Sequence, residues 1–130
     1  MAALSDYAEK LLLDWMMTSG TATRPTGWYI ALYTAAPSDS GGGTEVSGAG
    51  YVRQAVTFDA ATSPGGTTSN SGDVSFTAVG GDYGTVTHMG IFDASTGGNL
   101  LWHGVLSASK TVEDGDTITF SAGNIDLTMA

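Results

Sequence analysis

The stretch 84–106, GTVTHMGIFDASTGGNLLWHGVL, contains two β-type runs separated by a short turn. Residues 84–93 and 99–106 are rich in β-branched, aromatic and other apolar residues, as is typical of strands. The Ser-Thr-Gly-Gly connection within 94–98 has the length and composition of a hairpin turn. Because the strands of a hairpin run antiparallel, this stretch predicts an antiparallel sheet.

Similar runs bounded by Gly, Asn, Asp or Ser occur on both sides of this hairpin, at 27–34, 51–58, 73–77, 116–121 and 125–129. The segments between them, above all 35–50 and 60–72, are rich in Ser, Thr and Gly and are predicted to be surface loops. No alternation of strands and helices follows residue 20, which disfavours a parallel α/β sheet. We therefore expect a single mainly β domain over 1–130, with an antiparallel β-sandwich or jelly roll of about seven strands over 27–130.

One N-terminal α-helix is predicted within residues 1–20. Apolar residues recur there at steps of three and four and form one helical stripe: Leu4, Tyr7, Ala8, Leu11, Leu12, Trp15 and Met16. Ser5 or Asp6 is suited to cap the start of the helix, and Gly20 to end it, which predicts a helix over 5–19. We expect the stripe to dock on the rest of the domain through Leu4, Leu11, Leu12 and Trp15. Leu13 and Met17 lie off the stripe and are candidates for contact with a neighbouring subunit.

Composition excludes several classes of protein. Apolar residues make up 42% of the 130 positions, which is too many for a disordered chain. Thirteen acidic residues against four basic ones give a net charge of −9, so the chain is expected not to bind nucleic acid. The absence of Cys excludes disulfides and thiol chemistry. The early apolar run is interrupted by Asp14, which argues against a signal peptide and against membrane insertion, and synthesis in the cytoplasm is expected.

Two groups of ionisable residues were considered as chemical sites. The predicted hairpin brings His88 near the segment that contains His103, so the two form either half of a metal site or a pH-sensitive pair, or they are ordinary sheet residues. No third ligand stands at a fixed spacing, which favours the last interpretation. Likewise Glu113, Asp114 and Asp116 lack the spacing of a calcium loop and are better explained as turn residues. We therefore predict no catalytic residue, no metal ligand and no cofactor.

Aromatic residues are distributed over nearly every predicted element and are mostly assigned to the core. Alternation along 27–34 places Trp28, Ile30 and Leu32 on one face and the intervening residues, Tyr29 and Tyr33 among them, on the other. Simple packing is the favoured interpretation of these side chains. An exposed assembly interface or a carbohydrate-stacking platform is the alternative, with Tyr29 and Tyr33 as its candidates.

Two segments carry a resemblance to a known family. They are WYIALYTAAPSDSGGGTEVSG (28–48), continuing to YVRQ (51–54), and THMGIFD (87–93) with GGNLL (97–101). These segments resemble a family of small virion proteins of tailed bacteriophages, often labelled tail-fibre or minor structural proteins. The resemblance spans roughly residues 27–120 and implies a β-structured, non-catalytic component of the virion.

These observations lead to one expected function and two alternatives. The expected function is that of a structural protein, an accessory tail component or capsid decoration protein, that assembles in multiple copies as a homo-oligomer with other phage virion proteins. The first alternative is a receptor-binding module of the phage tail that recognises a host glycan. The second alternative is a cell-wall hydrolase, which requires two close carboxylates or a bound metal in a cleft.

Overall fold

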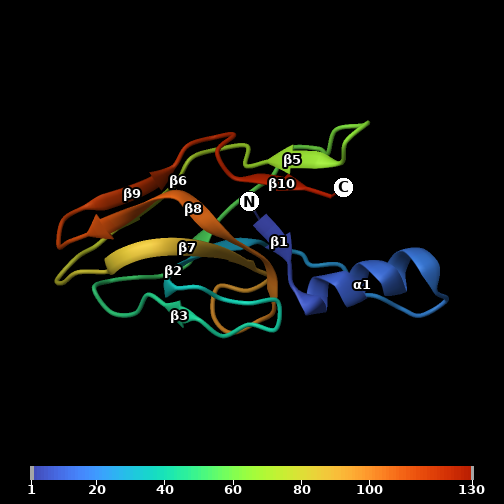
Figure 1. Cartoon of the computed structure of the whole chain (residues 1–130), viewed down its shortest axis with the longest axis horizontal. Helices are drawn as coiled ribbons and strands as arrows, with labels where there is room; N and C mark the ends of the chain where they lie inside the picture. The colour runs from blue at the N-terminus through green and yellow to red at the C-terminus, as the bar shows by residue number, and fades with distance from the viewer. Residues whose placement is uncertain (1, 130) are drawn as a thin grey trace.

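The computed structural model describes residues 2–129 and shows a mainly β molecule with one N-terminal helix (Figure 1). The elements are β1 (Ala2–Leu4), α1 (Asp6–Met17), β2 (Tyr29–Ala35), β3 (Thr44–Glu45), β4 (Gln54–Ala55), β5 (Thr67–Ser69), β6 (Val74–Thr77), β7 (Gly84–Phe92), β8 (Leu100–Val112), β9 (Thr117–Phe120) and β10 (Asp126–Thr128). Six strands form one sheet in the order β1-β8-β7-β2-β3, with β4 also pairing with β2. Two further sheets have two strands each, β10-β5 and β6-β9.

The hairpin of β7 and β8 forms the centre of the large sheet, as the sequence predicts. The two strands pair antiparallel with each other, from Gly84 opposite Val112 to Phe92 opposite Leu100. β8 continues six residues beyond the predicted end at 106. Every strand pair in the described part of the chain is antiparallel, so the expected sheet type is confirmed.

The main core lies between the large sheet and the two small sheets, which lie above it in the view of Figure 1. Strand β6 alternates buried and exposed residues and directs Val74 and Phe76 inward. Ile30 and Leu32 of β2 and Ile91 of β7 meet them from the large sheet. A smaller cluster covers the other face of the large sheet and consists of Ala31, Tyr33, Phe92 and Leu100. Both faces of β2 therefore carry buried side chains.

Several predicted boundaries were wrong because pairing with distant strands outweighs local composition. The predicted loop 35–50 contains β3, and Val46 after it is buried. The predicted loop 60–72 contains β5, which pairs with β10. The predicted strand 51–58 is reduced to the two residues of β4. The arrangement has one six-stranded sheet and two small ones, so a sandwich or jelly roll stays an expectation, as does the single domain.

The helix is confirmed, with its start at the predicted position. Ser5 is the N-cap, and its side chain accepts a hydrogen bond from the backbone N–H of Ala8. The helix ends at Met17, two residues earlier than predicted, with Thr18 and not Gly20 at its C-cap. No helix within residues 2–129 has the length and hydropathy required to cross a membrane.

Candidate interaction surface

The N-terminal end of α1 is fixed to the large sheet through Ser5. This side chain is 1% exposed. Its backbone N–H donates to Leu101 O at 2.9 Å, and its hydroxyl donates to the carbonyl oxygen of Leu100. The same hydroxyl oxygen accepts from Ala8 N–H at 3.1 Å. One buried serine therefore caps the helix and joins it to the first two residues of β8.

Asp39 provides a second attachment for the start of the helix. Its carbonyl oxygen accepts a hydrogen bond from Asp6 N–H at 2.9 Å. Its carboxylate oxygen Oδ1 accepts another from His103 Nε2 of β8 at 2.7 Å. The loop before β3, the helix and β8 thus meet at one residue.

Beyond its first turns the helix projects away from the sheets (Figure 1). Only Ala8 is buried among its residues, and the only elements with which α1 makes more than weak contact are β1 and β8. Trp15 lies on the same stripe as Ala8 and Leu11, yet it is 69% exposed. The prediction that the whole stripe docks through Leu4, Leu11, Leu12 and Trp15 was therefore wrong for Trp15, while the other three side chains are half-buried.

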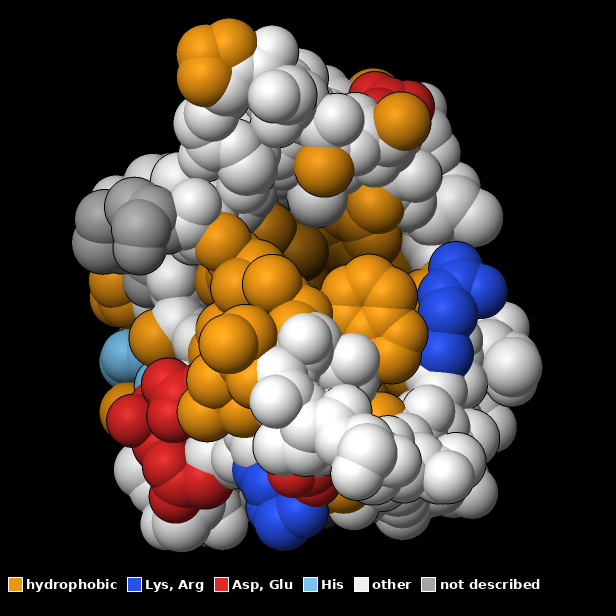
Figure 2. All heavy atoms as spheres, turned by 90° about the vertical axis from the view of Figure 1, so that its right-hand side faces the viewer, with side chains coloured by type: hydrophobic (Ala, Val, Ile, Leu, Met, Phe, Trp, Pro, Cys, Tyr) orange, Lys and Arg blue, Asp and Glu red, His pale blue; other side chains and the backbone are white. Residues whose placement is uncertain are grey.

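Large apolar side chains consequently remain on the surface of α1. We call this set the helix patch: Tyr7, Leu13, Trp15, Met16 and Met17. Figure 2 shows hydrophobic side chains gathered in the middle of the face toward which the helix projects, with acidic and basic groups at the edges. Large contiguous patches of exposed apolar side chains are typical of interaction sites, so the helix patch is a candidate for one.

A hollow of about 300 Å³ lies near the start of the helix. Its lining is mainly apolar and aromatic: Arg24, Trp28, Phe58, Thr68, Ile91, Leu101, Trp102 and Leu127. The Cζ atom of Arg24 lies 5.7 Å from the centre of the Trp28 ring, close enough for a cation–π contact. This hollow adds aromatic surface beside the attachment point of α1.

The four residues predicted as candidates for an interface fall in different places. Leu13 and Met17 are 61% and 73% exposed and belong to the helix patch. Tyr29 is half-buried at the start of β2. Tyr33 is 4% exposed and packs in the smaller core cluster, as the favoured interpretation of simple packing expects, so it is not part of an exposed platform. Alternation identified the shared face of the two tyrosines but not the side chains that cover it.

The two histidines are on neighbouring strands but do not stand directly opposite each other. His88 is paired with Val105, and His103 is paired with Gly90. His88 Nδ1 lies within hydrogen-bonding distance of Thr87 Oγ1, at 2.8 Å, while His103 binds Asp39. Within residues 2–129 no group of three or more His, Cys, Asp or Glu side chains is placed to hold a metal ion.

The acidic turn after β8 has its carboxylates engaged with backbone groups. Asp116 accepts from Glu113 N–H at 3.0 Å, and Asp114 accepts from Gly80 N–H at 3.0 Å. Asp82 in turn accepts from Asp114 N–H at 2.8 Å. The interpretation of these acidic residues as turn residues is confirmed.

The sequence reasoning missed a half-buried ionic network beneath the second face of the sheet. Arg53 pairs with Glu45 and lies 3.6 Å above the centre of the Phe92 ring. Tyr51 donates to Glu45 Oε2 at 2.7 Å and accepts from Leu32 N–H at 3.0 Å. The sequence did contain a signal for this network. Arg53 is one of only four basic residues in a strongly acidic chain, and it lies close to aromatic residues in the sequence.

The charges of this network alter the pKa values of its members. Burial alone raises the pKa of Glu45, but hydrogen bonds from Arg53 and Tyr51 outweigh it and hold that pKa below its ordinary value. Burial raises the pKa of Tyr51, and burial together with the charge of Glu45 raises the pKa of Tyr33 to about 12. Glu45 is thus ionised and the two tyrosines are neutral at physiological pH, as a structural cluster requires.

Comparison with known proteins is consistent with this picture. The model of a family described as podophage GP4 fiber I protein gp80 matches residues 3–128, nearly the whole chain. No curated protein matches the chain.

Proposed function

We propose that this chain, which belongs to the podophage GP4 fiber I protein gp80 family, attaches to other copies of itself through the helix patch. Members of this family are phage tail fibre structural components, so the chain is part of the virion. It acts in this proposal as a non-enzymatic adhesive subunit. The observation that carries the proposal is the exposure of Trp15 and Met17 at the end of a helix whose other end is fixed to the sheet.

The energetics favour an interface at this place. Full burial of one large apolar side chain contributes about 1.5–3 kcal/mol, and the helix patch offers five such side chains. Association costs several kcal/mol in lost freedom, which a single residue does not offset. Leu13, Met16 and Met17, which steps of three and four place on one side of α1, together offset this cost. The net charge of −9 opposes contact between copies, and burial of the helix patch must outweigh this repulsion.

The geometry supports specificity as well as adhesion. Asp14 and Lys10 form an ion pair on the exposed helix, and Asp6 and Glu9 add negative charge in its first turn. Arg24 lines the hollow, with its Cζ atom over the Trp28 ring. Acidic groups on the helix of one copy and Arg24 of another are thus complementary in charge.

Sedimentation velocity of the purified chain over a range of concentrations tests the proposal. We expect the wild-type chain to associate and the double variant Trp15→Ser, Met17→Ser to stay monomeric with unchanged circular dichroism. A matched control, Val52→Ser with Val79→Ser, removes two equally exposed apolar side chains far from α1 and should associate like the wild type. A wild-type chain that is monomeric at millimolar concentration, or a helix variant that associates normally, contradicts the proposal.

One observation favours a second candidate, recognition of a host glycan in the hollow lined by Trp28 and Trp102. Aromatic faces suit the apolar faces of sugars. The polar side-chain groups in the lining are those of Arg24 and Thr68 and the indole N–H groups of the two tryptophans, and none of them is a carboxylate or an amide. Loss of binding to a glycan array in a Trp102→Ala variant, with self-association intact, would support this candidate.

A further inference from the structure

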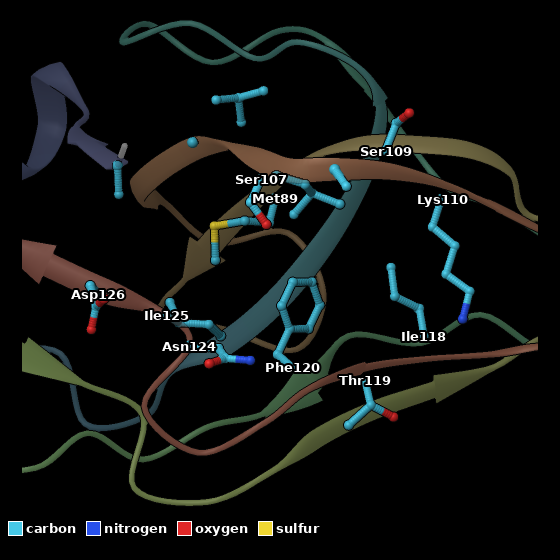
Figure 3. Close-up of a pocket in the computed structure, with 15 residues that line it drawn as sticks. Met89, Ser107, Ser109, Lys110, Ile118, Thr119, Phe120, Asn124, Ile125 and Asp126 are labelled. Atoms are coloured by element: carbon cyan, nitrogen blue, oxygen red, sulfur yellow. The ribbon is translucent and has the colours of Figure 1, made fainter.

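A groove of about 760 Å³ lies between β8 and β9, apart from the helix patch (Figure 3). Its walls come from the second half of β8 and from β9, and its base includes residues of β7 and of the segment before β10. In Figure 3, Ile118 and Phe120 project into the space between the strands, with Lys110 at one end and Asp126 at the other.

Both strands that flank the groove have an unpaired edge. β8 pairs with β7 along one side, but along the other it pairs with β1 only at Trp102, His103 and Gly104. β9 pairs with β6 alone among the described strands. Although a tight turn joins β8 to β9, no ladder forms between them. Two strand edges therefore face each other across a gap.

The ladder of β6 and β9 determines which backbone groups face the gap. Ala78 N–H donates to Asp116 O at 3.0 Å, which makes these opposite residues a hydrogen-bonded pair. Such pairs alternate along an antiparallel ladder, so Ile118 and Phe120 direct their backbone groups to β6, and Thr117 and Thr119 direct theirs toward β8. The hydrogen bond from Lys110 Nζ to Thr117 O, at 2.6 Å, agrees with this direction.

The base of the groove is apolar, whereas its walls present backbone groups. Met89, Ile118 and Ile125 are buried there, and Leu106 and Phe120 are half-buried. An occupant must therefore offer hydrogen-bonding groups along both sides and apolar side chains toward the base. An extended peptide with apolar residues at alternate positions has both properties.

We propose that this groove binds one extended strand of a different protein chain, which pairs with β8 on one side and β9 on the other. The regular edge available for pairing is that of β9, Thr117–Phe120, about 13 Å long at 3.3 Å per residue, because a register shift places residues 106–109 of β8 opposite Thr87 alone. The inserted strand joins the large sheet to the β6-β9 sheet and continues the line of β1, which occupies the beginning of the same β8 edge.

Two observations identify the occupant as a different chain with an acidic residue. The β-forming segments of the described residues already lie in sheets, so a second copy has no free strand to donate. Lys110 has no carboxylate partner among the described residues, which selects a strand with Asp or Glu at that end.

The test uses two synthetic eight-residue peptides, SVTVSVTE and its reverse ETVSVTVS. Each peptide places its Glu near Lys110 for one of the two possible directions of the inserted strand. We expect one of them to bind the full chain with a dissociation constant below about 1 mM in a titration followed by two-dimensional NMR. Amide exchange should slow at least tenfold at both Ser107 and Thr119. Absence of binding, or protection of only one strand edge, overturns the proposal.

A charge exchange checks the placement of the peptide. Lys110→Glu should weaken binding at least fivefold, and a peptide with Lys in place of its Glu should restore it. Lys10→Glu, on α1, changes the net charge equally and should alter affinity less than twofold. Equal losses of peptide affinity in the two variants would show a general charge effect and would contradict binding of the peptide in the groove. The Trp15→Ser, Met17→Ser chain should bind the peptide normally, so this test is separate from that of self-association.

Discussion

Arg53 donates one hydrogen bond to each carboxylate oxygen of Glu45, from Nε at 2.8 Å and from Nη2 at 2.9 Å. Its remaining nitrogen Nη1 donates to Ala94 O at 3.0 Å and to Gly97 O at 2.7 Å. The guanidinium also covers the Phe92 ring. One arginine side chain thus holds β3, the start of β4 and the turn between β7 and β8 together, in a geometry that lysine cannot reproduce.

Replacement of Arg53 should destabilise the chain strongly. Arg53→Gln leaves Glu45 and two backbone carbonyls without a charged partner, and we expect the free energy of unfolding to fall by about 3 kcal/mol. Arg53→Lys should recover part of this loss. Urea denaturation measures both. The control Lys10→Gln breaks an exposed ion pair and should change stability by less than about 0.5 kcal/mol; a similar small change for Arg53→Gln would show that the network is not stabilising.

Stability should also decrease at alkaline pH. The folded chain holds the pKa of Tyr33 at about 12, above its ordinary value of 10.0, and burial raises those of Tyr51 and Tyr83 as well. A raised folded pKa stabilises the protein below the unfolded pKa, and this contribution is lost as pH rises from about 10 toward 12. Urea midpoints at pH 8, 10 and 11 measure the loss, which should be smaller in Tyr33→Phe. Equal midpoints at the three pH values would contradict the prediction.

Ser5→Ala should loosen the helix from the sheet. The substitution removes the cap on Ala8 N–H and the hydroxyl that bonds the Leu100 carbonyl, both in a buried site. We expect a loss of about 1–3 kcal/mol in the free energy of unfolding. The control Ser47→Ala alters an exposed residue and should be neutral. If both variants unfold at the same urea concentration, Ser5 does not anchor the helix.

Gly90 and Gly72 give a matched pair for close packing. A Cβ atom at Gly90 lies 2.9 Å from Leu100 Cδ1 and 3.1 Å from Tyr33 Cε1, whereas none of the described atoms lies within 4 Å of one at Gly72. Gly90→Ala should therefore cost about 1–3 kcal/mol by overpacking, and Gly72→Ala should change stability by less than about 0.5 kcal/mol. Thermal unfolding of the two variants compares them. If Gly90→Ala leaves the thermal stability unchanged, the smaller core cluster rearranges around the added methyl group at little cost in free energy.

The sequence was informative where local chemistry decides the structure. The turn within 94–98 predicted the central hairpin, and Ser5 predicted the helix start, because both depend on residues that are neighbours along the chain. β5 escaped prediction since its pairing with β10 joins residues as far apart as Ser69 and Asp126, and its Thr and Ser residues resemble a loop.

The interaction surface shows a similar limit. Helical spacing showed that Trp15 shares a stripe with Ala8, but spacing does not tell whether the cover for that stripe belongs to the same chain. Tyr33 remained a candidate for an exposed platform for the related reason that Arg53 and Phe92 reach its face only through the folded structure. The groove exists because β8 and β9 do not form hydrogen-bonded strand pairs with each other, and no sequence pattern predicts this.

The joint formed by Ser5 and Asp39 has a mechanical consequence. Hydrogen bonds from three directions meet at the base of α1, from β8, from the loop before β3 and from the helix itself. A force applied at the far end of the helix is therefore carried into the middle of the six-stranded sheet and does not turn a loose hinge. In a fibre whose subunits attach through the helix patch, as proposed, bending and pulling forces pass through Ser5 and Asp39 on their way from one subunit to the next.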